Sequence, residues 1–438
     1  MSEYADIMIK NLSLASFRNY LDNEIVSLFF SSEDLVITPN CKIDLENDES
    51  DGHTQYVYRT TVEKAKQRLD VCGFSIANFE KIFNANMFQA VCYDDFLFHL
   101  KVDCDHFEEE SQKRIENRVT FTKWKNAMHK IVSYELEKGN LRWLDSLAEI
   151  NIRTECDKII FYSLSNIDAE SFYGINTRFI DVAYIFRMIL ESCDCDEEIE
   201  LDFSRLQYWA EDCIPRALVA VGNTEKTIVL VEGTSDKDIL EFSMKQIYPH
   251  LSDLFYFMDF ELENVKKRKG GVDTIANNLK AFVYSKIKAK FIAIFDNDAV
   301  GKQAAKKLVY EIGKLPDNFR VLNYPNIKRA QKYPTIGVNG KLVLDNVNER
   351  ACSIELYLPE FILKIDNMYP FVEWESRVTV KLGNQELQAY QGVVSEKVAI
   401  QKRFTQYKKS MVKGKCTFNE SEWIDMKSLL DEIINSFS

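Results

Sequence analysis

Four short apolar segments alternate with helical segments between Lys226 and Tyr324, and this alternation limits the possible folds more than any other feature. The apolar segments have the length of buried strands, and they read TIVLV, LFYFMDF, KFIAIF and FRVLNY. The segments between them repeat apolar side chains at three- and four-residue steps, which is typical of helices. Strands that alternate with helices form parallel sheets. The sequence therefore predicts an α/β domain with right-handed crossovers.

Acidic residues follow two of these predicted strands. Glu232 follows TIVLV directly, and Asp296 and Asp298 follow FIAIF. Because the carboxyl ends of parallel strands meet at one edge of a sheet, these three carboxylates are expected to cluster. Clustered carboxylates repel one another unless a cation joins them, and oxygen ligands suit Mg²⁺ or Mn²⁺. Asp236, one turn into the next helix, is placed to reach the same metal site.

A simpler interpretation is that each acid caps a helix or lies in its first turn, where the helix dipole favours negative charge. For Asp236 alone this interpretation is as good as metal binding. For the two motifs together it is weaker, because Glu232 ends an apolar strand and a second acidic pair recurs on the same edge.

The pair VEGTSD and FDNDAVG resembles the two-part motif of Toprim domains. These are the metal-binding catalytic domains of topoisomerases, bacterial primases, OLD-family nucleases and several ribonucleases. The resemblance implies that Asp296 and Asp298 hold Mg²⁺ or Mn²⁺, and that Glu232 is a metal ligand or a general acid/base. The extension Ser235-Asp236 is most similar to the OLD-like branch, which implies that Asp236 helps to hold a second ion.

Two later segments extend this resemblance. DNVNERACSIELYLP is similar to a later part of OLD-like proteins and makes Glu355 a further candidate metal ligand. YQGVVSEKVAIQKRF is similar to a lysine-bearing segment, which implies that Lys397 is a catalytic residue facing a phosphate or a leaving oxygen. A satisfied acid at a strand end and a solvated helix lysine remain equally good interpretations of these two residues.

Charge is unevenly distributed in this acidic chain, whose net charge is −13. Residues 1–223 hold 40 acidic and 23 basic residues, whereas residues 224–345 hold 15 acidic and 20 basic ones. Such a local basic excess favours contact with nucleic acid. A basic loop before Gly270 is predicted to grip phosphates, with a solvated loop as the alternative. Its members are Lys266, Lys267, Arg268 and Lys269.

The whole chain, with the two Toprim-like motifs in its second half, also resembles the HEPN/Toprim N-terminal-domain proteins of bacteria. The segments that carry this resemblance are YRTTVEKAKQRLDVCGF and SFYGINTRFIDVAYIFRMIL. A HEPN ribonuclease would need an arginine four to six residues before a histidine, and none of the five histidines has one. We therefore expect a scaffold or sensor here rather than a second nuclease.

Three parts are expected along the chain. Residues 1–222 are predicted to form a mostly helical α+β domain, and CDCDEEIELD near its end is interpreted as an acidic connector. Residues 223–365 are predicted to form the Toprim α/β catalytic domain, with a parallel sheet flanked by helices. Residues 366–438 are predicted to be a mostly helical extension. The absence of a signal or membrane segment and the scattered cysteines favour a reducing cytoplasm.

The function expected from these features is metal-dependent nuclease activity on DNA or RNA. The resemblance implies a bacterial anti-phage effector. The alternative is a non-catalytic nucleic-acid-binding or regulatory module. No phosphate-binding loop of the Walker type is present, so any ATP hydrolysis would come from a partner ATPase in trans. A regulatory partner and a homo-oligomer are both left open, and no membrane partner is expected.

Overall fold

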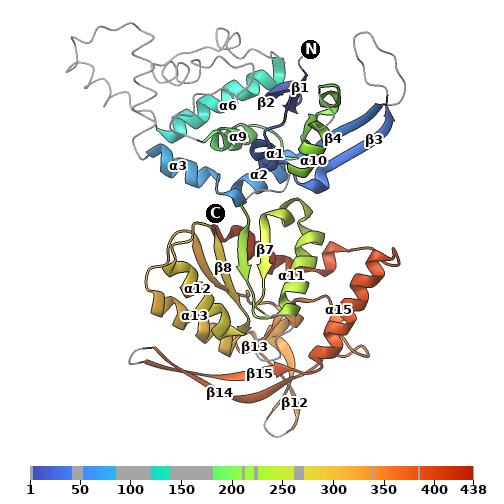
Figure 1. Cartoon of the computed structure of the whole chain (residues 1–438). Helices are drawn as coiled ribbons and strands as arrows, with labels where there is room; N and C mark the ends of the chain where they lie inside the picture. The colour runs from blue at the N-terminus through green and yellow to red at the C-terminus, as the bar shows by residue number, and fades with distance from the viewer. Residues whose placement is uncertain are drawn as a thin grey trace, which may run out of the picture. The chain divides into compact units, whose positions relative to one another are not determined.

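The computed structural model divides the chain into two compact units, Met1–Thr224 and Glu225–Phe437 (Figure 1). No helix among the described residues has both the length and the apolar character needed to cross a bilayer. The described residues are 3–41, 53–84, 120–138, 181–209, 213–220, 225–260, 271–337, 340–382 and 385–437.

The first unit is built on a five-stranded antiparallel sheet with the order β2-β1-β5-β4-β3. Buried and more exposed residues alternate along β1 and β5, as expected for a sheet with one face on the core. The strands are β1 (Tyr4–Ile9), β2 (Leu12–Arg18), β3 (Leu35–Cys41), β4 (His53–Thr61) and β5 (Glu198–Asp202).

Helices of this unit pack around aromatic side chains. Phe79 contacts both Phe83 and Trp124 edge-on, and all three are fully buried. Thr61 caps α2 with its side chain, and the helix stops at Gly73, which adopts the left-handed conformation. The helices are α1 (Asn23–Phe29), α2 (Val62–Cys72), α3 (Ile76–Asn84), α6 (Phe121–Lys138), α9 (Val182–Leu190) and α10 (Cys213–Ala220).

The first unit contains more β-structure than the sequence predicts. The supposed acidic connector includes β5, which pairs with both β1 and β4 at the centre of the sheet. Ile199 and Leu201 point into the core and are fully buried, while the acids that alternate with them are more exposed. Glu200, for example, forms an ion pair with Arg59 of β4. The apolar/polar alternation of β5 is only five residues long, and the high charge of the segment makes it difficult to recognise in the sequence.

The second unit contains the predicted parallel sheet, with the order β10-β8-β6-β7. All three strand pairs are parallel, so the strands end at one edge, and this part of the prediction is confirmed. The strands are β6 (Thr227–Leu230), β7 (Phe255–Met258), β8 (Phe291–Phe295) and β10 (Phe319–Asn323).

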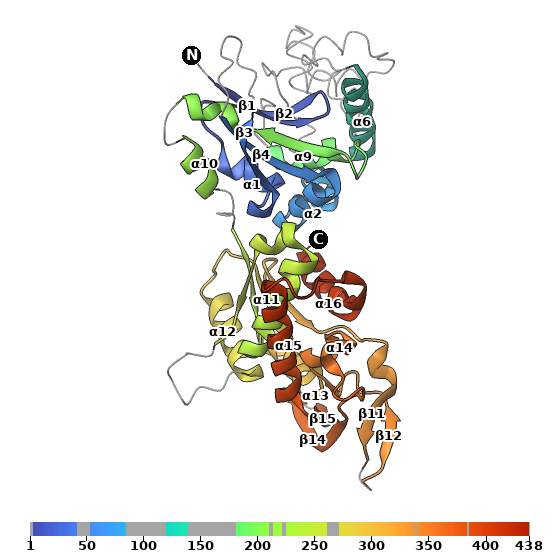
Figure 2. The ribbon, with the colours of Figure 1, turned by 90° about the vertical axis from the view of Figure 1, so that its right-hand side faces the viewer.

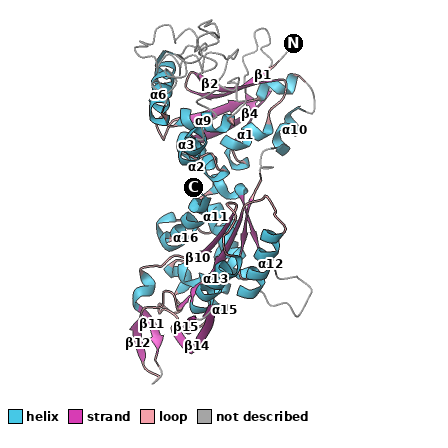
Figure 3. Cartoon of the chain, turned by 90° about the vertical axis from the view of Figure 1, so that its left-hand side faces the viewer, coloured by secondary structure: helices cyan, strands magenta, loops and turns pink. Residues whose placement is uncertain are grey.

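Helices flank both faces of this sheet (Figure 3). On one face, Ile275 and Leu279 of α12 and Leu308 of α13 pack against Phe291 and Phe295 of β8. On the other side of the sheet lie α11 and α16 (Figures 1 and 3). These helices are α11 (Thr234–Ile247), α12 (Val272–Tyr284), α13 (Ala299–Ile312) and α16 (Ile424–Ile434).

A second sheet lies beyond the parallel one, with the order β12-β11-β14-β15. It corrects the expectation that residues 366–438 are mostly helical, because this region begins with the long antiparallel hairpin of β14 and β15 and only then enters helix α15 (Figure 2). A short bridge of β13 with β9 joins it to the parallel sheet. These elements are β9 (Asn297–Asp298), β11 (Tyr333–Ile336), β12 (Leu342–Asp345), β13 (Ala351–Cys352), β14 (Val372–Leu382), β15 (Gln385–Val394) and α15 (Lys397–Val412).

Candidate active site

Glu232 connects the ends of two neighbouring strands. It lies in the loop between β6 and α11, and its Oε1 accepts a hydrogen bond of 3.1 Å from the backbone N–H of Asp296, which follows β8. Its own backbone carbonyl accepts a hydrogen bond of 3.0 Å from Gly271, at the start of α12. The parallel strands therefore bring the two acidic motifs together, although they lie 64 residues apart in the sequence.

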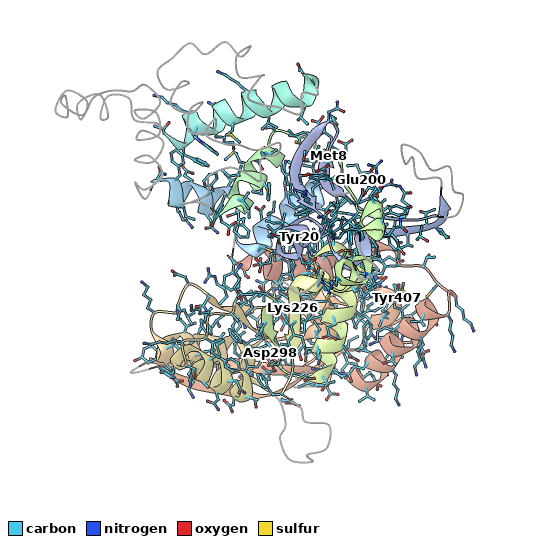
Figure 4. The ribbon with its side chains drawn as sticks, turned by 45° about the horizontal axis from the view of Figure 1, so that its top comes forward. Met8, Tyr20, Glu200, Lys226, Asp298 and Tyr407 are labelled. Carbon is cyan, nitrogen blue, oxygen red and sulfur yellow. The ribbon has the colours of Figure 1, made fainter. Side chains whose placement is uncertain are left out.

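Asp298 caps helix α13 (Figure 4). Its Oδ1 accepts a hydrogen bond of 2.7 Å from the N–H of Gly301, and its Oδ2 accepts one of 2.7 Å from the side-chain amide of Gln391 on β15. The amide oxygen of Gln391 in turn accepts a hydrogen bond of 3.2 Å from Val300. The second sheet thus holds Asp298 in place, and the helix-capping interpretation of this residue is correct.

Among the acids of the cluster, the side chain of Asp296 receives the least stabilisation from its neighbours. Its Oδ1 is buried and makes no hydrogen bond with any described residue. Its backbone is fixed, because its carbonyl accepts a hydrogen bond of 3.2 Å from Asn323 at the end of β10. An ionised carboxylate oxygen in such a place is costly unless something positive or hydrogen-bonding approaches it.

Gly301 lies directly against the backbone of Asp296. A Cβ atom at this position would be 2.5 Å from the carbonyl oxygen of Asp296 and 3.1 Å from its amide nitrogen. Both contacts are with backbone atoms, which cannot rotate away. The glycine of FDNDAVG is therefore needed for the close approach of α13 to the acidic turn.

We expect Gly301→Ala to lower the melting temperature and to weaken Mn²⁺ binding by about tenfold or more, because the added methyl group must displace Asp296. Thermal unfolding and calorimetry with Mn²⁺ measure the two effects. Alanine in place of glycine in a helix ordinarily stabilises by about 1 kcal/mol, so the expected sign is reversed. A more stable variant with unchanged Mn²⁺ affinity would contradict the steric argument.

Asp236 lies in the first turn of α11 and is only 7% exposed. Its Oδ1 accepts a hydrogen bond of 3.3 Å from the hydroxyl of Tyr324, which follows β10. A solvated first-turn acid would not be buried in this way. The burial of Asp236 therefore favours the interpretation that it belongs to the carboxylate cluster.

The buried Glu355 and the partly exposed Lys397 form an ion pair on the C-terminal side of the cluster. Glu355 is 2% exposed and accepts hydrogen bonds of 2.7 Å from Ser353 and 3.0 Å from Gln401. The ammonium group of Lys397, the first residue of α15, lies 3.6 Å from Glu355 Oε2. Lys397 thus directs a positive charge at the acids, which a solvated helix lysine would not do.

Burial and mutual repulsion set the pKa values in this cluster. Burial, with Asp298 and Asp236 nearby, raises the pKa of Glu232 to about 7, although the hydrogen bond from Asp296 opposes the shift. Burial and then Glu355 raise the pKa of Asp236 to about 7. Burial and then Glu232 raise the pKa of Asp296 well above its ordinary value. Burial opposes the charge on Lys397, yet the surrounding acids, Glu355 first, raise its pKa.

We expect the metal-free protein to become less stable as pH rises from about 4 to about 7, and its stability to level off above that range. The folded pKa values of Glu232 and Asp236, about 7, exceed the unfolded value of about 4, so the folded state binds more protons between these limits. The stability that these groups contribute is therefore present at low pH and is lost as pH rises through about 7. Melting temperatures in chelator at constant ionic strength measure this effect.

Saturating Mn²⁺ should remove or reverse this trend, because metal binding requires deprotonated carboxylates and strengthens as pH rises. A melting temperature that is flat or rising with pH in the chelated protein would contradict the assigned pKa shifts.

The cluster has the chemistry of a divalent-metal site. As the side chains lie, no three His, Cys, Asp or Glu residues of the described ranges converge on one ion position. The acids nevertheless raise one another's pKa values, and the Oδ1 of Asp296, which makes no hydrogen bond with any described residue, lies among them. Oxygen donors in this number, with little other compensation for their charge, fit Mg²⁺ or Mn²⁺.

The structure brings six predicted site residues to one place, and sequence reasoning missed the residues that support them. The six are Glu232, Asp236, Asp296, Asp298, Glu355 and Lys397. The predicted basic loop, Lys266, Lys267, Arg268 and Lys269, lies outside the described residues. The missed side chains are Gln391, Gln401 and Tyr324. Gln391 and Gln401 lie in the segment around Lys397, but no spacing rule marks a glutamine as a support for an acid more than 40 residues away.

A hollow of about 440 Å³ lies in the first unit, and none of the predicted site residues lines it. Tyr20, Trp209 and Arg216 are among its lining residues. Its lining residues include no cluster of acids, so the carboxylate cluster remains the better candidate for catalysis.

Comparison with known proteins gives information on the first unit. Residues 1–218 match the family described as HEPN/Toprim N-terminal domain 1. This match supports the resemblance inferred from the front of the chain, and it ends before the carboxylate cluster begins. No curated protein and no solved structure matches the chain.

Proposed function

We propose that this chain, whose first 218 residues match the HEPN/Toprim N-terminal domain, is a nuclease with an OLD-like Toprim catalytic unit that uses Mg²⁺ or Mn²⁺. One observation carries the proposal. The Oδ1 of Asp296, which is buried and has no hydrogen-bond partner among the described residues, lies among neighbouring acids at the carboxyl edge of a parallel sheet, with Lys397 facing them. This edge is where open α/β sheets bind their ligands.

Each residue has a role in the proposed reaction. Asp296 and Asp298 would hold one divalent ion, and Glu232 and Asp236 a second, with Glu355 as a further ligand on the same side. When bound, such ions supply positive charge that polarises the phosphate and favours ionisation of an attacking water.

Two side chains handle protons and charge. Glu232 would accept a proton from the attacking water or help to hold the second ion, and its pKa of about 7 applies to the metal-free protein. Lys397 remains charged and is placed to bind a phosphate oxygen or to stabilise the leaving oxygen, while Glu355 holds it in position.

A direct assay tests the proposal. Purified protein is incubated with plasmid DNA, single-stranded DNA and total RNA, each with Mg²⁺, Mn²⁺ or chelator. We expect metal-dependent cleavage of at least one substrate. Metal-dependent binding without cleavage of any of them would favour the alternative, a non-catalytic nucleic-acid-binding or regulatory module.

The resemblance to OLD-like and HEPN/Toprim proteins supports a wider role. In this proposal the chain is a bacterial anti-phage effector that is restrained until infection by a regulatory partner, an ATPase in trans or its own oligomerisation. Plaque counts on bacteria that express the protein test this role, and equal plaque numbers with and without it would refute it.

A further inference from the structure

Helix α15 and the turn after it are the most one-sidedly charged part of the described structure. Residues 397–419 contain seven Lys or Arg residues and no Asp or Glu, in a chain whose net charge is −13. The helix begins at Lys397, inside the carboxylate cluster, and runs outward from it. A concentrated positive charge in an acidic protein marks a place where an anion is attracted.

One side of α15 packs against the rest of the second unit. Ile400 and Phe404 are buried there. Lys408 lies 3.3 Å from Asp238 of α11, and Arg403 donates to the backbone carbonyls of Phe361 and Ile362. These contacts leave the opposite side of the helix exposed, and Tyr407 marks the middle of the helix in Figure 4.

The exposed side carries a row of lysines. Lys402, Lys409 and Lys413 follow one another at steps of seven and four residues, so they lie on one face, and all three are exposed. Lys415 extends the row past the helix end. Among the described residues, no acid forms an ion pair with any of the four. Their charge is therefore available to a ligand rather than used in the fold.

The length of this row fits a polymer. At a rise of 1.5 Å per residue, the distance from Lys402 to Lys413 along the helix is about 16 Å. One strand of a duplex has a phosphate about every 3.4 Å along its axis, so the row spans roughly five phosphates. A single nucleotide could not contact lysines so far apart.

We propose that the exposed lysine face of α15, defined by Lys402, Lys409, Lys413 and Lys415, binds the sugar–phosphate backbone of a polynucleotide and leads it to the carboxylate cluster. The substrate of the proposed nuclease is then a polymer rather than a nucleotide, and this part of the inference rests on the proposed function. Acids repel phosphates, so the cluster needs such a neighbouring attraction to hold a polyanion. Backbone contacts of this kind position a strand without reading its sequence.

A membrane surface is a less suitable partner for this helix. An interfacial helix buries an apolar face in the lipid. The apolar side chains Ile400 and Phe404 of α15 are already buried in the protein. On the exposed side only single valines, Val398 and Val412, accompany the lysines.

The test compares two triple variants that remove the same charge. Lys402→Gln/Lys409→Gln/Lys413→Gln neutralises the lysine face. Lys226→Gln/Lys288→Gln/Lys314→Gln neutralises three exposed lysines near the opposite edge of the sheet, where its strands begin. Both sets are built on Glu232→Gln, and affinity for labelled 4-mer and 30-mer oligonucleotides is measured in chelator at several salt concentrations.

We expect the lysine-face variant to bind the 30-mer about 10- to 100-fold more weakly at low salt. Its salt slope should fall by about 0.7–0.9 for each phosphate that the lysines no longer neutralise. The control should bind like the parent, and the 4-mer should bind weakly to all three proteins. Melting temperatures verify that each variant is folded.

Equal affinity and equal salt slope in the two triple variants would overturn the inference. So would lysine-dependent binding to vesicles of anionic phospholipid with no change in oligonucleotide affinity. Because the readout is binding, the inference stands even if the wild-type chain never cleaves a substrate. If the wild-type chain cleaves nucleic acid and the lysine-face variant binds like its parent, the inference about the lysine face is wrong and the proposed nuclease function stands.

Discussion

Glu232→Gln is expected to lower the cleavage rate by at least about 10²-fold while leaving the affinity for nucleic acid close to that of the parent and the melting temperature no lower than that of the parent. The amide keeps the shape of the side chain, and its oxygen can still accept the hydrogen bond from Asp296. It removes the group that takes a proton near pH 7 and contributes negative charge to the metal site. Cleavage rate, affinity and thermal unfolding are measured on one preparation.

Glu360→Gln is a suitable control for this change. Glu360 is exposed, lies outside the carboxylate cluster and forms an ion pair with Lys364. This variant should cleave at the parental rate. Full cleavage by a folded Glu232→Gln protein would overturn the proposed nuclease mechanism and favour the binding-module alternative.

Asp296→Asn is expected to abolish Mn²⁺ binding and cleavage, and yet to raise the melting temperature of the metal-free protein by several degrees. The substitution removes a carboxyl group whose ionisation is opposed by burial and by repulsion from Glu232, Asp236 and Asp298. About 1 kcal/mol shifts the melting temperature of a domain of 150–250 residues by about 2–4 °C. Calorimetry with Mn²⁺ and thermal unfolding in chelator measure the two effects.

Asp317→Asn makes the same chemical change at an exposed position and should alter neither quantity. Unchanged Mn²⁺ affinity in Asp296→Asn would remove this residue from the metal site. A lower melting temperature in chelator would instead mean that the carboxylate of Asp296 supports the fold. Opposite effects on stability and activity are what distinguish a functional acid from a structural one.

The α/β core and its acidic edge could be predicted because the sequence patterns that indicate them lie within short segments of the chain. Each strand is a short apolar run, each helix has its own periodicity, and parallel pairing then places Glu232 and Asp296 at one edge whatever the details of packing. The residues that complete the cluster could not be derived in this way. Gln391 reaches Asp298 from 93 positions away, and only the hairpin of β14 and β15 brings it there.

The first unit gives a second example of structure that local sequence patterns do not predict. β5 pairs with β4, although 136 residues separate Thr61 from Glu198 in the sequence. The alternation of apolar and polar residues in β5 is only five residues long. The five acids from Asp194 to Glu200 favour a loop when only neighbouring residues are considered, so the sequence alone does not indicate a strand. Strand pairing over such separations is a property of the tertiary fold rather than of the local sequence.

The residues of the carboxylate cluster are synthesised in a fixed order, and this order determines when the site can form during translation. Glu232, Asp236 and Asp296 leave the ribosome well before Gln391 and Lys397, which the structure places at their side. A nascent chain that already contains the α/β core therefore lacks both the amide that holds Asp298 and the lysine that faces the acids. On the nuclease function proposed above, the site would be complete only once the segment that carries Gln391 and Lys397 has folded against the acids.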